Sequence, residues 1–191
     1  MEWLIPTQTL HAANIQLGMI TAGPKPMIPI GYKDSDVRFS SLSILLPSLT
    51  VKSFDKTTGQ LVLSLADSSH VNTKITNIQD MLVAAVCSNY HKWFAYERSS
   101  IDARGGFQPM IRGNEIHLYC PVHTDITQTV PFFCEGKWSE QGLLKNKIEP
   151  GTRIRVAIRM QGISFHVHRN SDVWTGKYRI QHKILGILMS K

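Results

Sequence analysis

Basic and apolar residues alternate strictly in Arg153-Ile154-Arg155-Val156-Ala157-Ile158-Arg159-Met160, with Ala157 taking one of the basic positions. The same alternation returns in Lys177-Tyr178-Arg179-Ile180-Gln181-His182-Lys183-Ile184. Successive side chains of a β-strand point to opposite faces, so a period of two indicates a strand with one buried and one exposed face. The two stretches therefore predict two strands of a folded sheet, each carrying a ladder of cations over a hydrophobic underside.

The net charge of the chain is concentrated in the same region. Residues 151–191 hold eight Lys or Arg residues and a single acid, Asp172, so this segment carries the whole net charge of +7. Residues 1–150 hold thirteen basic and thirteen acidic residues and are neutral as a unit. A basic face on an otherwise neutral protein is typical of proteins that bind a polyanion, such as nucleic acid, a membrane surface or an acidic protein.

The composition indicates one globular domain spanning residues 1–191. The chain is 42% hydrophobic and 18% charged, which allows a sizeable core. The N-terminus has no signal-peptide pattern, and the longest apolar run, Met81 to Cys87, is far shorter than the roughly 20 residues that span a bilayer. The three widely spaced cysteines, Cys87, Cys120 and Cys134, make no disulfide framework. We expect a soluble, intracellular protein with reduced cysteines and no membrane partner.

The elements expected along the chain are mainly strands. Five strands are predicted in the first third of the sequence, at Asn14 to Ile20, Met27 to Tyr32, Val37 to Leu46, Leu49 to Phe54 and Gly59 to Leu65. The hydrophobic period then changes to three and four residues, which predicts one long helix from about Thr76 to Phe94, opened by a capping box of Thr76 and Gln79. A further hairpin is expected at Gln108 to Cys120. The fold class is thus mainly β with one helix inserted between strands.

The basic strands suggest a surface for single-stranded nucleic acid. Such surfaces combine cations that follow the phosphate backbone with aromatic side chains on which bases stack. Candidate stacking residues are Phe165, Trp174 and Tyr178, which either point outward with the cations or pack beneath them. The candidate phosphate contacts are Arg153, Arg155, Arg159, Lys177, Arg179 and Lys183.

Enzyme and metal signatures are absent from the sequence. It holds no nucleophile elbow, P-loop, Gly-rich dinucleotide turn or paired catalytic carboxylates, so no catalytic residue, enzymatic activity or cofactor is expected. His166 and His168 share one strand face, but no third ligand is apparent and the adjacent Arg169 disfavours a cation. Cys120, His123 and Cys134 do not match a zinc-knuckle spacing, so we expect no metal.

Four segments carry a resemblance to a known family. They are Leu45-Leu46-Pro47-Ser48-Leu49-Thr50-Val51, Gly59-Gln60-Leu61-Val62-Leu63-Ser64-Leu65, Pro150-Gly151-Thr152-Arg153-Ile154-Arg155-Val156 and Val173-Trp174-Thr175-Gly176-Lys177-Tyr178-Arg179-Ile180-Gln181-His182-Lys183-Ile184. Their order resembles the OB-fold single-stranded-DNA-binding proteins of large eukaryotic DNA viruses and podophages. The closing segments of those proteins likewise carry a Trp after an apolar residue, a glycine and a basic strand with a Gln.

The resemblance implies a five-stranded barrel with extra strands and a viral, non-enzymatic protein that coats single strands. It would act in DNA replication, recombination or repair, at sites of replication in the cytoplasm or nucleus of the host, with replication proteins as further partners. Relatives of this kind often end in an acidic tail, whereas this chain ends Ile187-Leu188-Met189-Ser190-Lys191.

Three alternatives stay open at this level. A structural, matrix-like β protein would use the same basic face on genomic nucleic acid or on an acidic partner, without preferring single strands. RNA can replace DNA, because stacking and phosphate contacts do not read the 2′-OH. A metal-dependent β-barrel enzyme would rest on His166 and His168. A homo-oligomer is compatible with each of them.

Overall fold

The computed structural model describes residues 3–94, 102–120, 132–134, 137–139, 148–168 and 173–189, with only the backbone described at 132–134 and 137–139. Its helices are η1 (Thr7–Thr9), η2 (Ala12–Asn14) and α1 (Ser69–Phe94). Its strands are β1 (Ile5–Pro6), β2 (Ile15–Leu17), β3 (Met27–Asp34), β4 (Val37–Phe39), β5 (Leu42–Leu45), β6 (Leu49–Phe54), β7 (Gln60–Ser64), β8 (Phe107–Gln108), β9 (Ile111–Arg112), β10 (Glu115–Tyr119), β11 (Phe132–Cys134), β12 (Lys137–Ser139), β13 (Arg153–Val167) and β14 (Trp174–Met189).

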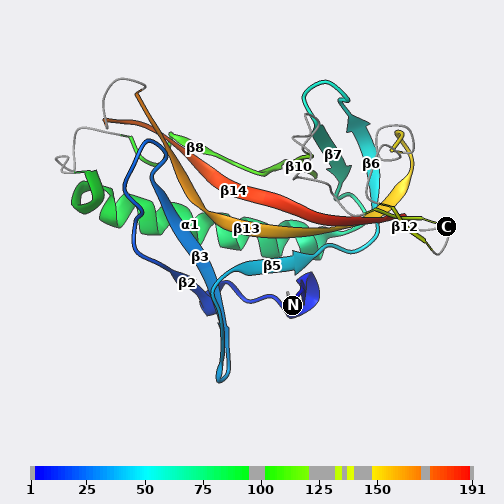
Figure 1. Ribbon diagram of the computed structural model, residues 1–191, viewed down its shortest axis with the longest axis horizontal. Coiled ribbons are helices and arrows are strands. Elements are labelled where there is room, and N and C mark those ends of the chain that lie inside the picture. Colours follow the sequence, from blue (N-terminus) through cyan, green and yellow to red (C-terminus); the bar gives the residue numbers. More distant parts are fainter. Residues whose placement is uncertain are drawn as a thin grey trace.

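The two alternating stretches lie in β13 and β14, which form one long antiparallel hairpin through the length of the molecule (Figure 1). Arg159 lies opposite Lys183 in this ladder, and Phe165 lies opposite Tyr178. The other edge of β13 pairs in turn with β6, β5 and β3, so β13 is the strand on which the rest of the sheet is assembled. The prediction of two half-buried strands is confirmed.

The long helix α1 runs alongside this hairpin (Figure 1). It begins at Ser69, seven residues before the expected start at Thr76, because Val71 and Ile75 already belong to its buried face. The capping-box interpretation is wrong: the Thr76 hydroxyl bonds to Asn72 within the helix, and Gln79 is buried. The buried positions keep the expected spacing of three and four residues.

The sheet is not closed into a barrel, so the expected five-stranded barrel is not what the chain forms. The strands β14, β13, β6, β7 and β10 are joined by ladders in that order, but no ladder joins β10 to β14 among the described residues. These edges instead hold short strands, with β9 on β10 and with β8 and β11 on β14. We call the space between β10 and β14 the open seam. A hydrogen bond crosses it, from the backbone N–H of Tyr119 to Nε2 of His182 at 3.0 Å.

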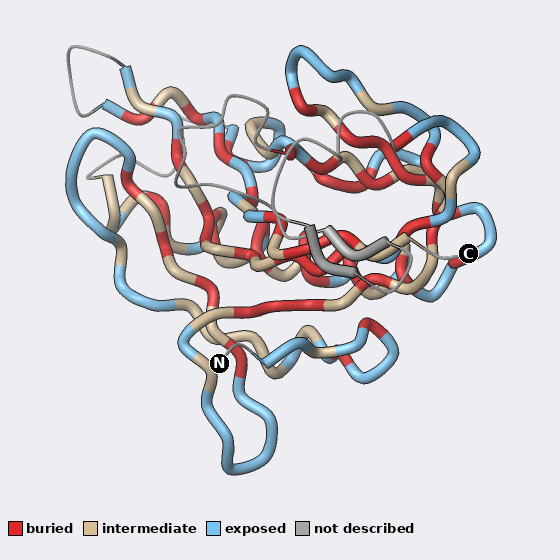
Figure 2. The backbone as a smooth tube through the Cα atoms, turned by 45° about the vertical axis from the view of Figure 1, so that its right-hand side comes forward, coloured by how far each residue is buried: buried red, intermediate tan, exposed pale blue. Residues whose placement is uncertain are grey.

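A single hydrophobic core lies between the sheet and α1. Buried residues run along the strands, while loops and hairpin tips are exposed (Figure 2). Trp174, Tyr32 and Tyr178 are the largest fully buried side chains. Within the described part of the chain, no helix has the length and apolar character needed to cross a membrane.

Candidate nucleic-acid interface

The predicted phosphate contacts all lie on the outward face of the β13–β14 hairpin. Arg153, Arg155, Lys177, Arg179 and Lys183 are exposed and Arg159 is half-buried, while the residues between them in sequence are mostly buried. The guanidinium of Arg153 donates to the carbonyl oxygen of Ser48 at 3.0 Å. The alternation of the sequence thus places the six cations along one face.

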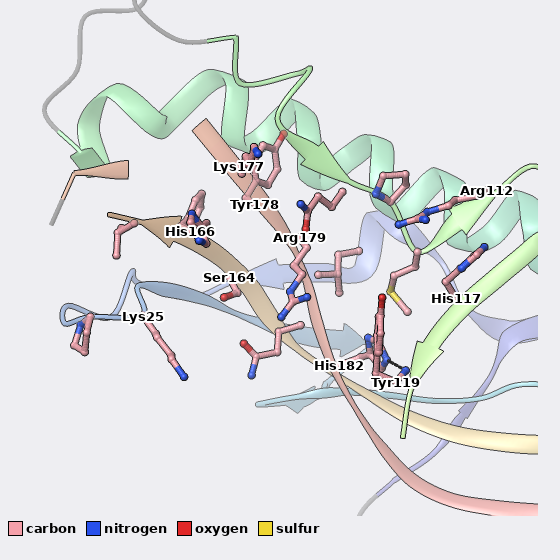
Figure 3. A pocket seen from close by; sticks show the side chains of 18 of the residues that line it. Lys25, Arg112, His117, Tyr119, Ser164, His166, Lys177, Tyr178, Arg179 and His182 are labelled. Carbon is pink, nitrogen blue, oxygen red and sulfur yellow. Dashed lines mark hydrogen bonds between the residues drawn. The ribbon is translucent and has the colours of Figure 1, made fainter. Parts of the chain in front are cut away.

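A groove of about 1260 Å³ runs beside the hairpin, along residues 164–167 of β13 and residues 177–182 of β14. Lys177 and Arg179 line it, whereas Arg153, Arg155, Arg159 and Lys183 lie outside it. The groove is lined by Pro24, Lys25, Gln108, Pro109, Met110, Arg112, His117, Tyr119, Ser164, Phe165, His166, Val167, His168, Lys177, Tyr178, Arg179, Ile180, Gln181 and His182. Figure 3 shows Arg179 between Lys25 and His166 on one side and Arg112, His117 and Tyr119 on the other.

The described residues that line the groove carry positive charge and no carboxylate. Four of its described residues are permanent cations and four are histidines, and none is Asp or Glu. Lys25 comes from the β2–β3 connection and Arg112 from β9, far in sequence from Lys177 and Arg179. A concave surface lined by one sign of charge concentrates counter-ions, so this groove suits a polyanion.

Glu115, an acid on the strand β10 that contributes to the groove, is already paired. Glu115 lies two residues before His117 on β10, and its Oε1 accepts a hydrogen bond from Lys52 Nζ at 2.5 Å. That hydrogen bond lowers the pKa of Glu115, so the carboxylate stays ionised beside its lysine. Its second oxygen lies 3.3 Å from Nε2 of His117. The repulsion that Glu115 would exert on an anion in the groove is therefore partly cancelled by Lys52.

The three aromatic residues expected to stack on bases lie in the core instead. The exposed fractions of Phe165, Trp174 and Tyr178 are 3%, 2% and 1%. Trp174 stacks on Phe94 of α1 with ring centroids 5.1 Å apart, and its indole N–H donates to the carbonyl oxygen of Lys177 at 2.9 Å. Phe165 and Tyr178 touch the groove wall but expose almost no surface to it. Of the two orientations that the sequence left open, the structure has the inward one, because these three residues occupy the apolar face of the hairpin and pack beneath the cations.

Sequence reasoning missed Lys25, Arg112, His117 and Tyr119. Tyr119 is 46% exposed, and its strand alternates, with Ile116 and Leu118 in the core. This period of two in the predicted hairpin could have identified His117 and Tyr119 as outward residues. Lys25 lies within a Gly-Pro turn and gave no comparable signal.

Hydrogen bonds hold the two walls of the groove in place. Oε1 of the buried Gln79 accepts the backbone N–H groups of Met110 and Ile111, at 2.7 and 3.2 Å, and so fastens this wall to α1. At the other wall, the N–H of Tyr178 donates to the carbonyl oxygen of Gly106. A Cβ on Gly106 would lie 1.8 Å from the carbonyl oxygen of Gly176, so this close approach requires glycine.

His182 is held neutral at the open seam. Burial lowers its pKa to about 4, and the nearby Arg179 acts in the same direction. A neutral imidazole is also what the hydrogen bond requires, because Nε2 must offer a lone pair to the N–H of Tyr119.

The stability of the protein is expected to fall as the pH drops from about 6.5 to about 4. The depressed pKa of His182 means that the unfolded chain binds its proton first, so the free energy of unfolding decreases across this window, by about 3 kcal/mol at full protonation. Urea unfolding at several pH values measures the effect. The variant His182→Gln removes the titrating group, and it should flatten the pH dependence; an unchanged profile would contradict the assignment.

The histidines of the groove form no metal centre with the residues described. Nδ1 of His166 lies 3.1 Å from the hydroxyl of Thr175, and no group of three or more His, Cys, Asp or Glu among the described residues could hold a metal ion. Cys120 is buried, and burial raises the pKa of its thiol to about 12. His123, Arg169 and the side chain of Cys134 lie outside the described residues.

The groove is therefore basic, none of the described residues that line it is acidic, and it lies beside the open seam of the sheet. Among known proteins, no protein-family model matches the chain, and no curated protein matches it in sequence.

Proposed function

We propose that this chain is a non-enzymatic protein that binds single-stranded DNA largely without regard to sequence. The observation that carries the proposal is the groove, in which Lys25, Arg112, Lys177 and Arg179 face a space that no described carboxylate lines. Nonspecific binders of single strands use such a cationic groove to follow the backbone. Coating of single strands during replication, recombination or repair, in a viral setting, is the role that we infer from it.

The arrangement of strands supports an OB-type domain in an opened form. A meander of β6, β7 and β10 is joined through β6 to the β13–β14 hairpin, which gives five strands in a path that the open seam interrupts. OB-folds are five-stranded, partly open barrels that bind oligonucleotides on their outer face. The groove lies over the open seam, since β10 and β14 both contribute to its lining.

The test is a titration of the purified protein with matched oligonucleotides of single-stranded DNA, double-stranded DNA and RNA. We expect single-stranded DNA to bind at least tenfold more tightly than the duplex, with an affinity that falls as salt rises, by a slope of about −0.7 per phosphate neutralised. The affinity for RNA of the same sequence shows whether the protein prefers single-stranded DNA or single-stranded RNA. No binding of any single strand would refute the proposal.

A matrix-like protein that packs on genomic nucleic acid or on an acidic partner is the second candidate. The observation in its favour is the row of cations outside the groove, made up of Arg153, Arg155, Arg159 and Lys183. It predicts equal affinity for single and double strands in the same titration. Light scattering with and without DNA would show whether copies of the chain assemble, and pull-down with replication proteins would test that class of partner.

A further inference from the structure

Tyr119 is the aromatic residue that the groove exposes. Of the Phe, Tyr and Trp residues that line the groove in the described part of the chain, Phe165 and Tyr178 are buried, while Tyr119 is 46% exposed. A large exposed ring in a cationic groove offers a flat apolar face beside the groups that would bind phosphate. Figure 3 shows Tyr119 at the end of the groove where it meets His182.

The backbone of Tyr119 is fixed from both sides. In the ladder of β10 with β7, Tyr119 lies opposite Gln60, and the next N–H, of Cys120, donates to the carbonyl oxygen of Gly59 at 2.8 Å. On the other side, its own N–H donates to Nε2 of His182 at 3.0 Å across the open seam. A ring carried on so restrained a backbone loses little conformational entropy when a ligand packs on it.

The surroundings of Tyr119 suit a nucleobase. The rings of Tyr119 and His182 lie 6.3 Å apart and are tilted by 34°. His117 lies two residues before Tyr119 on β10, and its Nδ1 lies 3.2 Å from Nε2 of Gln60. His117 and Gln60 thus form a polar pair beside Tyr119, and Arg179 lines the same groove. A strand whose phosphates meet Arg179 could therefore present a base to Tyr119.

We propose that Tyr119 is the surface on which an unpaired base stacks, and that His182 is the positioning residue that holds it there across the open seam. The inference rests on the proposed function and deepens it, because it names the residue that makes the groove prefer single strands. In a duplex the bases are paired and stacked on each other, so none can reach Tyr119 without the cost of unpairing. A single strand offers its bases freely, and each stacked base strengthens binding by roughly 5-fold to 150-fold.

The experiment compares a thymidine oligonucleotide with an abasic oligonucleotide of the same length and charge, by fluorescence anisotropy. The wild-type protein should bind the base-bearing strand roughly 10-fold or more tightly than the abasic strand. Tyr119→Ala should lose that difference while its affinity for the abasic strand and its salt slope stay unchanged. Tyr119→Phe should keep it, because the ring and not the hydroxyl stacks. Trp3→Ala, which removes an aromatic side chain that is 68% exposed outside the groove, is the matched control and should behave as wild type.

The role of His182 is tested in the same assay with two variants. His182→Leu removes the acceptor for the N–H of Tyr119 and should reduce the preference for the base-bearing strand, whereas His182→Gln keeps an acceptor and should restore it. Thermal melting of both variants identifies any loss of folding. If His182→Leu does not fold, Tyr119→Ala still tests the stacking role, because its side chain is exposed and its removal should not affect folding. If Tyr119→Ala retains the full base preference, the inference is overturned while the proposed function stands. If wild type binds neither strand, the proposed function itself fails.

Discussion

The double variant Lys177→Glu, Arg179→Glu is expected to weaken binding to single-stranded DNA by on the order of 100-fold at moderate salt. Both side chains are exposed, line the groove and belong to β14. Their reversal removes two attractive contacts with phosphate and places two carboxylates in a groove that no described carboxylate lines. Because two phosphate contacts are lost, the slope of log affinity against log salt should become shallower by about 1.4. Anisotropy titrations over a series of salt concentrations measure both quantities.

The matched control is Lys33→Glu, Arg38→Glu on the β3–β4 hairpin. These residues are a cross-strand pair and are exposed, and the tip of their hairpin projects from the opposite side of the molecule to β8 and β10 (Figure 1). Each double variant lowers the formal net charge from +7 to +3, so general electrostatic attraction changes equally. The control should lose only a few-fold in affinity, with its salt slope nearly unchanged. Equal losses in the two variants would mean that the net charge of the protein, and not the groove, governs binding.

The sequence predicts the hairpin well because its pattern is local. An alternation of cations and apolar residues requires only that each strand has one buried face, and Arg155 and Arg179 are outward as that rule requires. Tyr178 has the opposite parity to Arg179 and is buried. The same rule applies to Trp174, four residues earlier on the same strand, and would have placed it inward as well.

Phe165 shows where the local rule fails. It has the same odd parity as Arg153, Arg155 and Arg159, so simple alternation would place it outward with the cations. The ladder of β13 with β14 is irregular between Met160 and Gly162, and beyond this β-bulge the buried side chains are those of the odd-numbered Ile163 and Phe165. An extra residue in one strand exchanges its two faces. Nothing in the alternation itself reveals where such a bulge lies.

The groove and the open seam depend on contacts between segments far apart in the chain. Lys25, Arg112 and Tyr119 reach the groove because β3 pairs with β13, β9 pairs with β10, and Gln79 fastens the wall beside Arg112 to α1. The edges of β10 and β14 are occupied by short strands, β9 on β10 and both β8 and β11 on β14, each of two or three residues. Pairings this short leave no periodic signal, which is why the closed barrel was a reasonable but wrong expectation.

Trp174→Ala is expected to produce the largest loss of stability, with the free energy of unfolding reduced by about 3–5 kcal/mol. The ring is 2% exposed and lies between α1 and the hairpin, where it stacks on Phe94 and meets Phe165 edge-on at 5.6 Å. The substitution leaves a cavity and also removes the donor that satisfies the carbonyl oxygen of Lys177. For a chain of this length, the melting temperature should fall by roughly 6–20 °C. Urea unfolding and thermal melting followed by circular dichroism measure the change, and Trp174→Phe should lose less because a ring remains.

The variant Trp174→Ala also shows whether Trp174 acts in the core or in binding. Since Trp174 has almost no surface in contact with solvent, it cannot stack on a base while the protein keeps this structure. At temperatures well below its melting point, folded Trp174→Ala should therefore still bind a base-bearing strand more tightly than an abasic strand. Tyr119→Ala, which removes an exposed ring, should keep the stability of the wild type and lose this preference. A stable Trp174→Ala variant that binds the base-bearing and the abasic strand equally well would contradict this expectation. It would mean that Trp174 stacks on a base, which requires the hairpin to turn its apolar face toward the nucleic acid.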